Sequence, residues 1–265
     1  MANIGVFDSG VGGLWILKHL REELPGYNYV FFGDQAHVPY GERKLDEIKD
    51  FSERITNFLI GKGCKIIVIA CNTASAAALH YLRQKFPDII FVGMEPAVKP
   101  AVESTITGKV GVLATPATFQ GELYNSVVER FAHDTEIFKD TCLGLVEQIE
   151  KGEFESEKTK EILRKAITPM LIEGIDTIVL GCTHYPFVIP AIREIVGNEI
   201  KIIDPTKAIV KRVAVLAEEH GVLGEKGDKK TEILTSSKKE DIIKITDKLF
   251  GDDVKVDEVV WGRDL

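Results

Sequence analysis

Two short stretches of similar composition constrain this chain more than any other feature. Residues 66–75 read Ile-Ile-Val-Ile-Ala-Cys-Asn-Thr-Ala-Ser, and residues 177–186 read Thr-Ile-Val-Leu-Gly-Cys-Thr-His-Tyr-Pro. In each, an apolar run of strand length leads through a small residue to a cysteine and polar neighbours, which is typical of a buried parallel strand that ends abruptly. Ligands of open α/β sheets bind outside the carboxyl ends of the strands. Cys71 and Cys182 are therefore predicted to face such a crevice.

Strand-length apolar runs alternate with helical patterns in the first part of the chain. The predicted strands and helices, in chain order, cover residues 3–7, 15–24, 29–32, 45–60, 66–70, 74–86 and 89–92. Strands that alternate with helices of ten to fifteen residues indicate βαβ units and a parallel sheet. We therefore predict an α/β fold.

The pattern begins again after Pro100. A strand at 110–115 precedes a helix at 119–131, a strand-like stretch at 136–138 and a helix at 156–172, which leads to the second cysteine strand. The offsets are similar, since Cys71 follows Gly5 by 66 positions and Cys182 follows Gly111 by 71. We interpret this as an internal duplication. A pseudo-twofold axis would then place the two thiols on opposite sides of one cleft.

The C-terminal part has no counterpart in either repeat, so we expect it to complete one of them. Its predicted elements are a strand at 201–204, a helix at 206–220, a loop at 224–230, and two short strands, 233–234 and 256–260, that flank a helix at 239–250.

Charge and hydropathy exclude several classes of function. The net charge is −8 and no Lys/Arg cluster stands free of acids, so a nucleic-acid partner is not expected. No apolar run approaches the ~20 residues of a membrane span. The N-terminal residues enter a strand at once and lack the basic region of a signal peptide, so we expect a cytoplasmic protein. In that compartment the four cysteines, none in a C-x-x-C pair, are predicted to be free thiols rather than disulfides or zinc ligands.

Two thiols that face one small molecule suit a proton transfer without any cofactor. A thiolate takes a proton from one face of a carbon while the other thiol delivers a proton to the opposite face, which inverts that carbon. A cysteine thiol has a pKa near 8.5, so neighbouring groups must tune it. The sequence offers His184, two residues from Cys182, together with Glu147 and Asp8.

A set of motifs resembles that of the glutamate racemases, members of the cofactor-independent aspartate/glutamate racemase superfamily. The motifs are Phe7-Asp-Ser-Gly-Val-Gly-Gly13, Val38-Pro-Tyr-Gly41, Ala70-Cys-Asn-Thr-Ala74, Leu145-Val-Glu147 and Gly181-Cys-Thr-His-Tyr-Pro186. They occur in the family's order. The resemblance implies an enzyme that interconverts L- and D-glutamate, supplies D-glutamate for peptidoglycan, needs no cofactor or metal and forms a homodimer. The sequence departs from the family's pattern at Trp15, where the family more often has a small or polar residue.

The resemblance also implies the site and the domains. Cys71 would serve D-glutamate and Cys182 L-glutamate, with Asp8, His184 and Glu147 assisting. The implied substrate-binding positions are Asp8, Ser9, Pro39, Tyr40, Gly41, Asn72, Thr73, Thr183 and His184. The implied fold is two pseudo-symmetric flavodoxin-like α/β domains, residues 1–95 with 208–265 and residues 96–207, with the active site in the cleft between them.

Other interpretations of the same residues remain open. The substrate could be aspartate or a broader set of amino acids, because one methylene gives only about 1–3 kcal/mol of discrimination. The chain could also bind a ligand without catalysis, although binding does not require paired thiols. The loop 8–13 does not fit a phosphate-binding G-x-G-x-x-G, and His184 with one cysteine supplies too few ligands for a metal. Cys64 and Cys142 lack the polar neighbours and are expected to be structural.

Overall fold

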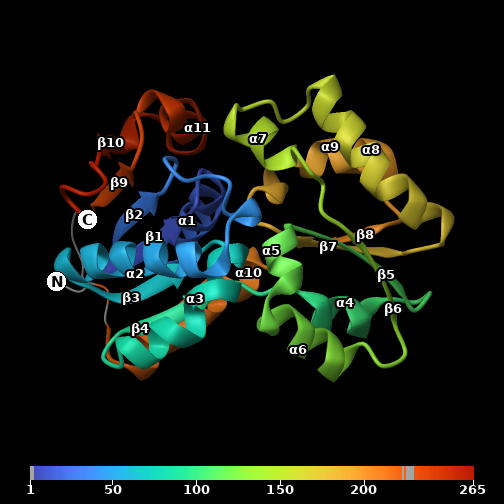
Figure 1. Cartoon of the computed structure of the whole chain (residues 1–265), viewed down its shortest axis with the longest axis horizontal. Coiled ribbons are helices and arrows are strands. Elements are labelled where there is room, and N and C mark those ends of the chain that lie inside the picture. Colours follow the sequence, from blue (N-terminus) through green and yellow to red (C-terminus); the bar gives the residue numbers. More distant parts are fainter. Residues whose placement is uncertain (1–2, 223, 225–229) are drawn as a thin grey trace.

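The chain folds into two parallel β-sheets. The computed structural model describes residues 3–222, 224 and 230–265. Within them, the first sheet contains β1 (Asn3–Asp8), β2 (Asn28–Gly33), β3 (Cys64–Ile69), β4 (Ile90–Gly93), β9 (Thr231–Thr235) and β10 (Lys255–Glu258). The second contains β5 (Lys109–Ala114), β6 (Glu136–Asp140), β7 (Thr177–Gly181) and β8 (Lys201–Ile203). Figure 1 shows the two sheets next to each other along the long axis of the molecule.

Both sheets use one strand order, which explains the similar spacing of their motifs. The first sheet runs β10-β9-β2-β1-β3-β4 and the second β6-β5-β7-β8, so β2-β1-β3-β4 corresponds to β6-β5-β7-β8. This is the beginning of the flavodoxin-like order 2-1-3-4-5, in which ligands bind where the strand order reverses. The two cysteines follow equivalent strands, β3 and β7. The predicted fold of two pseudo-symmetric α/β units is confirmed.

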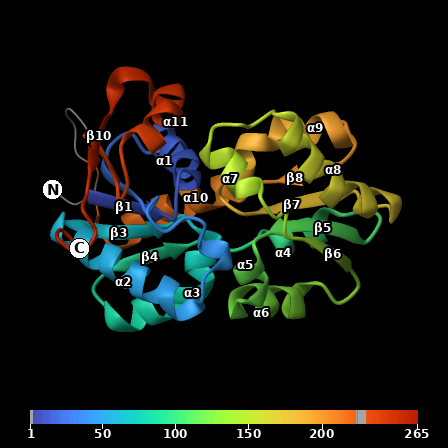
Figure 2. The same ribbon diagram turned by 45° about the horizontal axis from the view of Figure 1, so that its top comes forward.

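Helices cover both faces of each sheet (Figure 2). In the first unit, α1 (Gly12–Glu23), α10 (Thr206–Glu219) and α11 (Glu240–Phe250) lie on one face, and α2 (Leu45–Gly61) and α3 (Asn72–Lys85) lie on the other. In the second unit, α7 (Leu145–Glu150), α8 (Glu157–Ile172) and α9 (Ile189–Val196) lie opposite α4 (Val98–Ser104), α5 (Pro116–Gln120) and α6 (Glu122–Phe131). Short 3-10 helices occur at η1 (Tyr40–Glu42), η2 (Tyr185–Val188) and η3 (Gly251–Asp253).

One hydrophobic core runs through both units. Leu14, Leu17 and Leu20 of α1 belong to the same buried cluster as Leu163 of α8 and Ile192 of α9. Two smaller clusters fill the opposite faces, one beneath α2 and α3 and the other beneath α4 and α6. Because apolar burial is the main favourable term in folding, the shared cluster holds the two units against each other.

Several predicted elements differ in detail. The helix expected at 119–131 is two helices, broken at Gly121, whose backbone is extended and lies so near α3 that a Cβ there would be 2.5 Å from that of Ala76. Helix α1 starts at Gly12 rather than at Trp15. The segment that carries Glu147 is the short helix α7, and α4 and α9 were not predicted.

The C-terminal segment returns to the first unit. Strand β9 pairs with β2, and α10 packs against α1 and β4. The expected domain limits, 1–95 with 208–265 and 96–207, stay a prediction. Most of the loop expected at 224–230 lies outside the described residues. None of the described helices has both the length and the apolar character that a membrane span needs.

Candidate active site

The two cysteines of the matched strands line one small cavity, which we call the inner cavity. Cys71 is the N-cap residue of α3, and its Sγ accepts a hydrogen bond from the Ala74 N–H at 3.4 Å. Cys182 follows β7, and its Sγ lies 3.7 Å from Nδ1 of His184. Both thiols are buried. The duplication therefore brings together two sulfur atoms that are 111 positions apart in the chain.

The inner cavity is lined by residues from both units. They are Ser9, Pro39, Tyr40, Gly41, Cys71, Asn72, Thr73, Thr115, Val146, Cys182, Thr183 and His184. Thr115 and Val146 were not predicted from the sequence. The volume is about 10 Å³, which is room for about one water molecule. The cavity is thus too small for an amino acid.

Asp8 lies behind the cavity wall and joins the two units. Its Oδ1 accepts from the Gly10 N–H and its Oδ2 from the Thr183 hydroxyl, both at 2.9 Å. Burial raises the pKa of this carboxyl, and the charge of His184 and the two hydrogen bonds oppose that rise. Asp8 therefore affects Cys71 through its charge and contacts the second unit through Thr183.

Cys71 is held as a neutral thiol. Burial raises its pKa to about 12, and the negative charge of Asp8 adds to the rise. The Ala74 N–H opposes this change but is outweighed. Ser9 Oγ lies 3.7 Å from Sγ. The raised pKa favours the protonated form of Cys71 at neutral pH.

His184 is positioned between Cys182 and a carboxylate. Its Nε2 lies 2.5 Å from Oε1 of Glu150, while Nδ1 faces Cys182. Burial lowers the pKa of His184, but the hydrogen bonds to Cys182 and Glu150 and the charge of Glu150 outweigh burial and hold it well above its ordinary value. This direction favours the imidazolium form of the ring next to the Cys182 sulfur.

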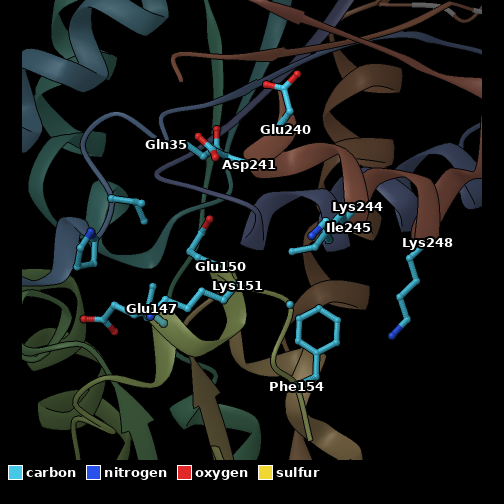
Figure 3. Close-up of a pocket in the computed structure, with 14 residues that line it drawn as sticks. Gln35, Glu147, Glu150, Lys151, Phe154, Glu240, Asp241, Lys244, Ile245 and Lys248 are labelled. Atoms are coloured by element: carbon cyan, nitrogen blue, oxygen red, sulfur yellow. The ribbon is translucent and has the colours of Figure 1, made fainter. Parts of the chain in front are cut away.

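The carboxylate that contacts His184 belongs to Glu150, a residue that the sequence analysis did not name. The assisting role that the resemblance implies for Glu147 stays a prediction. Glu147 lines a larger neighbouring cavity but not the inner one, and Figure 3 shows the two side chains pointing in different directions. Both residues lie on α7, three positions apart. Glu150 lies one helical turn after Val146, which lines the inner cavity, and residues four apart share a helix face. The sequence alone offered no signal for Glu150, because the position of Val146 was not predicted either.

Glycines allow the loop after β1 to meet the second unit. A Cβ on Gly10 would overlap Oε1 of Glu150, and one on Gly12 would lie 2.6 Å from Oγ1 of Thr183. The Val11 N–H, at the start of α1, donates to the same Glu150 oxygen at 2.9 Å. The helix N-terminus carries a partial positive charge, so it favours this carboxylate.

Asn72 presents an amide without a protein partner to the inner cavity. It is 3% exposed, and neither Oδ1 nor Nδ2 has a hydrogen-bond partner. A buried polar group without a partner costs roughly 1–3 kcal/mol. The side chain is therefore available to a ligand that occupies the cavity.

Threonine hydroxyls join the units on one side of the inner cavity. Thr73 Oγ1 lies 2.7 Å from Oγ1 of Thr115, which lies 2.9 Å from Oγ1 of Thr118. Gly41 packs so closely that a Cβ there would be 2.8 Å from that of Thr115. Next to it, the Tyr40 hydroxyl donates to Asp34 at 2.6 Å. Tyr40 and Gly41 are thus held by contacts on both sides of the loop.

The remaining cysteines, Cys64 and Cys142, do not line the inner cavity. Cys64 and Cys142 are buried and free, as are Cys71 and Cys182. Burial raises the pKa of Cys64 to about 12. Among the described residues, no three His, Cys, Asp or Glu side chains are grouped so as to hold a metal ion.

Comparison with known proteins places the chain among racemases. Residues 16–213 match the family model Asp/Glu/Hydantoin racemase. A glutamate racemase from Roseiflexus sp. (strain RS-1) is 49% identical over 220 residues, 83% of this chain and 81% of its own. The glutamate racemase isoform RacE1 of Bacillus anthracis superposes with a TM-score of 0.88 at 29% identity over 98% of both chains. A glutamate racemase from Francisella tularensis subsp. tularensis SCHU S4, solved in complex with D-glutamate, superposes with a TM-score of 0.85 at 28% identity over 98% of this chain and 97% of its own.

Proposed function

This chain belongs to the Asp/Glu/hydantoin racemase family and within it to the glutamate racemases, and we propose that it interconverts L- and D-glutamate with Cys71 and Cys182 as the two acid/base groups. The relative in complex with D-glutamate supports this substrate. The observation that carries the two-thiol mechanism is the convergence of both sulfur atoms on one cavity from equivalent strands.

From L-glutamate the reaction starts with a thiolate at Cys182. The thiolate removes the Cα proton from one face of the substrate and becomes a thiol. The Cys71 thiol then gives its proton to the opposite face of the same carbon, which yields D-glutamate and a Cys71 thiolate. The reverse reaction starts from that second protonation state. Such proton transfers contribute roughly 10²–10⁴-fold each to the rate, provided that the groups reach the carbon directly.

The neighbours of each thiol suit these roles. The imidazolium of His184, held by Glu150, stabilises a negative sulfur at Cys182. On the other side, burial and the charge of Asp8 keep the proton on Cys71 until the carbanion needs it. The proton on Cys71 is thus held ready for the face of the carbon opposite Cys182.

Substrate binding is assigned to the polar groups that line the inner cavity. Asn72 offers an amide without a partner, and the hydroxyls of Ser9, Thr73 and Thr183 surround the same space. Hydroxyls and an amide donate hydrogen bonds to carboxylate oxygens and accept them from an ammonium group. These groups match the charged ends of glutamate.

The cellular role follows from the resemblance. We propose that the enzyme supplies D-glutamate for peptidoglycan from a cytoplasmic location, as a homodimer and without a cofactor or metal. Neither nucleic acid nor a membrane is among its proposed partners. These assignments extend the family relationship and do not depend on the mechanism above.

Racemisation in D₂O tests the function. We expect L-glutamate without added cofactor to lose its optical activity and to gain deuterium at Cα, and L-aspartate to do neither. Activity on both amino acids would identify a broader racemase. No exchange with either, in folded protein, would overturn the proposal and leave a binding protein.

A further inference from the structure

We propose that a larger cavity beside the active site is the antechamber through which substrate reaches and leaves the inner cavity. This cavity, which we call the outer cavity, has a volume of about 660 Å³, within the roughly 300–1,000 Å³ typical of ligand sites. It is bordered by the loop after β2, by α7 with the residues that follow it, and by α11 (Figure 3). Only the identity of the substrate rests on the proposed function.

The inner cavity cannot admit its substrate as it stands. Its volume of about 10 Å³ holds about one water molecule, and an amino acid with a second carboxylate is several times larger. The thiols are 5% and 7% exposed, so the surface offers no open route to them. A part of the wall must therefore move at each turnover.

The two cavities have two lining residues in common. Pro39 and Val146 line both of them, one from each unit. Glu150 lines the outer cavity, and its carboxylate reaches His184 in the inner one. Separation of Pro39 from Val146 would join the two spaces without breaking a hydrogen bond between their side chains, because both are apolar.

Other parts of the inner wall are held more firmly. On the side of α3 and α5, buried hydroxyls of Thr73 and Thr115 are hydrogen-bonded, and Gly41 touches Thr115. At the back, Asp8 accepts a hydrogen bond from Thr183 across the units. Opening at either place would leave buried polar groups without partners, which costs roughly 1–3 kcal/mol for each group. The apolar wall is the easier one to open.

The chemistry of the outer cavity suits passage rather than tight binding. Its rim carries the exposed residues Lys151, Glu240, Asp241, Lys244 and Lys248, so it is open to solvent. Lysine ammonium groups attract the carboxylates of glutamate, whereas Glu147 and the other acids oppose their retention. Three lysines face four acids here, so an anionic substrate gains no strong electrostatic hold.

A bulky side chain in the outer cavity tests the route. Lys244→Trp on α11 and Lys151→Trp on the opposite wall add bulk at exposed positions, and Lys165→Trp makes the same change on α8, away from both cavities. Lys244→Ala removes the charge without adding bulk. We expect kcat/KM for both enantiomers to fall about tenfold or more in the first two variants and to change less than about twofold in the others.

Alkylation of Cys182 by iodoacetamide, followed by mass spectrometry, gives a second readout that does not depend on the substrate. Alkylation should be slower than in the wild type in Lys244→Trp and Lys151→Trp, and unchanged in Lys165→Trp and Lys244→Ala. If both occluding variants racemise glutamate and react with iodoacetamide as fast as the wild type, the antechamber is overturned. If the wild type does not racemise glutamate but the occluding variants still protect Cys182, the proposed function fails and the antechamber stands.

Discussion

Oε1 of Glu150 lies 2.5 Å from Nε2 of His184, and the other nitrogen of the same ring lies 3.7 Å from Cys182 Sγ. Glu150 also accepts the Val11 N–H, so one carboxylate connects α7 and the start of α1 to the ring beside a reactive thiol. Together with Asp8 and Thr183 on the other side of the loop, this contact ties the chemistry of the site to the packing of the two units.

Glu150→Gln should lower kcat by about tenfold or more, a part of the ~10²–10⁴ that a positioned acid/base system contributes. The carboxylate raises the pKa of His184, so its loss lowers that pKa. The activity of the variant should therefore begin to fall at a lower pH than that of the wild type. Glu147→Gln is the matched control and should leave the pH–rate profile unchanged. An unchanged profile in Glu150→Gln would remove Glu150 from the mechanism.

The same pair makes a prediction for stability. The pKa of His184 in the folded protein lies above its ordinary value of 6.5. The stability that its partners give is therefore complete below about pH 6.5 and is lost as the pH rises through the folded pKa. The free energy of unfolding, measured with urea, should exceed that of Glu150→Gln below this range, and the difference should shrink at alkaline pH. A difference that grows with pH would contradict the sign.

Asn72→Leu should separate stability from substrate binding. Both polar atoms of Asn72 are buried without a partner, so an apolar side chain of similar size should stabilise the substrate-free protein by roughly 1–3 kcal/mol. The KM for glutamate should rise at least about tenfold, the effect of losing ~1.4 kcal/mol of binding. Thermal unfolding and steady-state kinetics measure the two effects.

Thr56→Val is the control for Asn72. The Thr56 hydroxyl is also buried without a partner, but it lies on α2, away from the inner cavity. Thr56→Val should therefore stabilise the protein against unfolding without a change in the KM for glutamate. If Asn72→Leu binds glutamate as tightly as the wild type, the amide does not contact the substrate.

Gly10→Ala should lower activity by about tenfold or more, as Glu150→Gln should, because the new Cβ would displace the Glu150 carboxylate from His184. Gly61→Ala is the same chemical change at the end of α2, where nothing lies within 4 Å of the new Cβ. It should keep full activity and gain up to about 1 kcal/mol of stability, since alanine is favoured over glycine in a helix. Comparable activity in the two variants would show that the close approach at Gly10 is not needed.

Sequence patterns predicted the parts of the site that depend on local chain geometry. Cys71, Asp8 and His184 follow strands or turns, where an apolar run and its abrupt end mark the carboxyl edge of a parallel sheet. The equal strand order of the two sheets accounts for the matched cysteine motifs. The α/β fold class was predicted from the alternation of strands and helices along the chain.

Residues placed by long-range packing were not predictable in this way. Glu147 and Glu150 are both acids on one short helix, and only the packing of α7 against α1 decides which of them meets His184. Thr115 enters the inner cavity because the second unit docks against Thr73. The outer cavity depends on α11, whose position is set by the return of the C-terminal segment to the first sheet.

Deuterium incorporation by cysteine variants tests the central claim most directly. In D₂O, Cys71→Ala and Cys182→Ala should both lose racemisation by roughly 10²–10⁴-fold. Cys182→Ser and Cys71→Ser keep the shape of the site and show whether the loss is chemical. Circular dichroism of the protein confirms that each variant is folded. Racemisation of L-glutamate at the wild-type rate by either alanine variant would contradict the two-thiol mechanism.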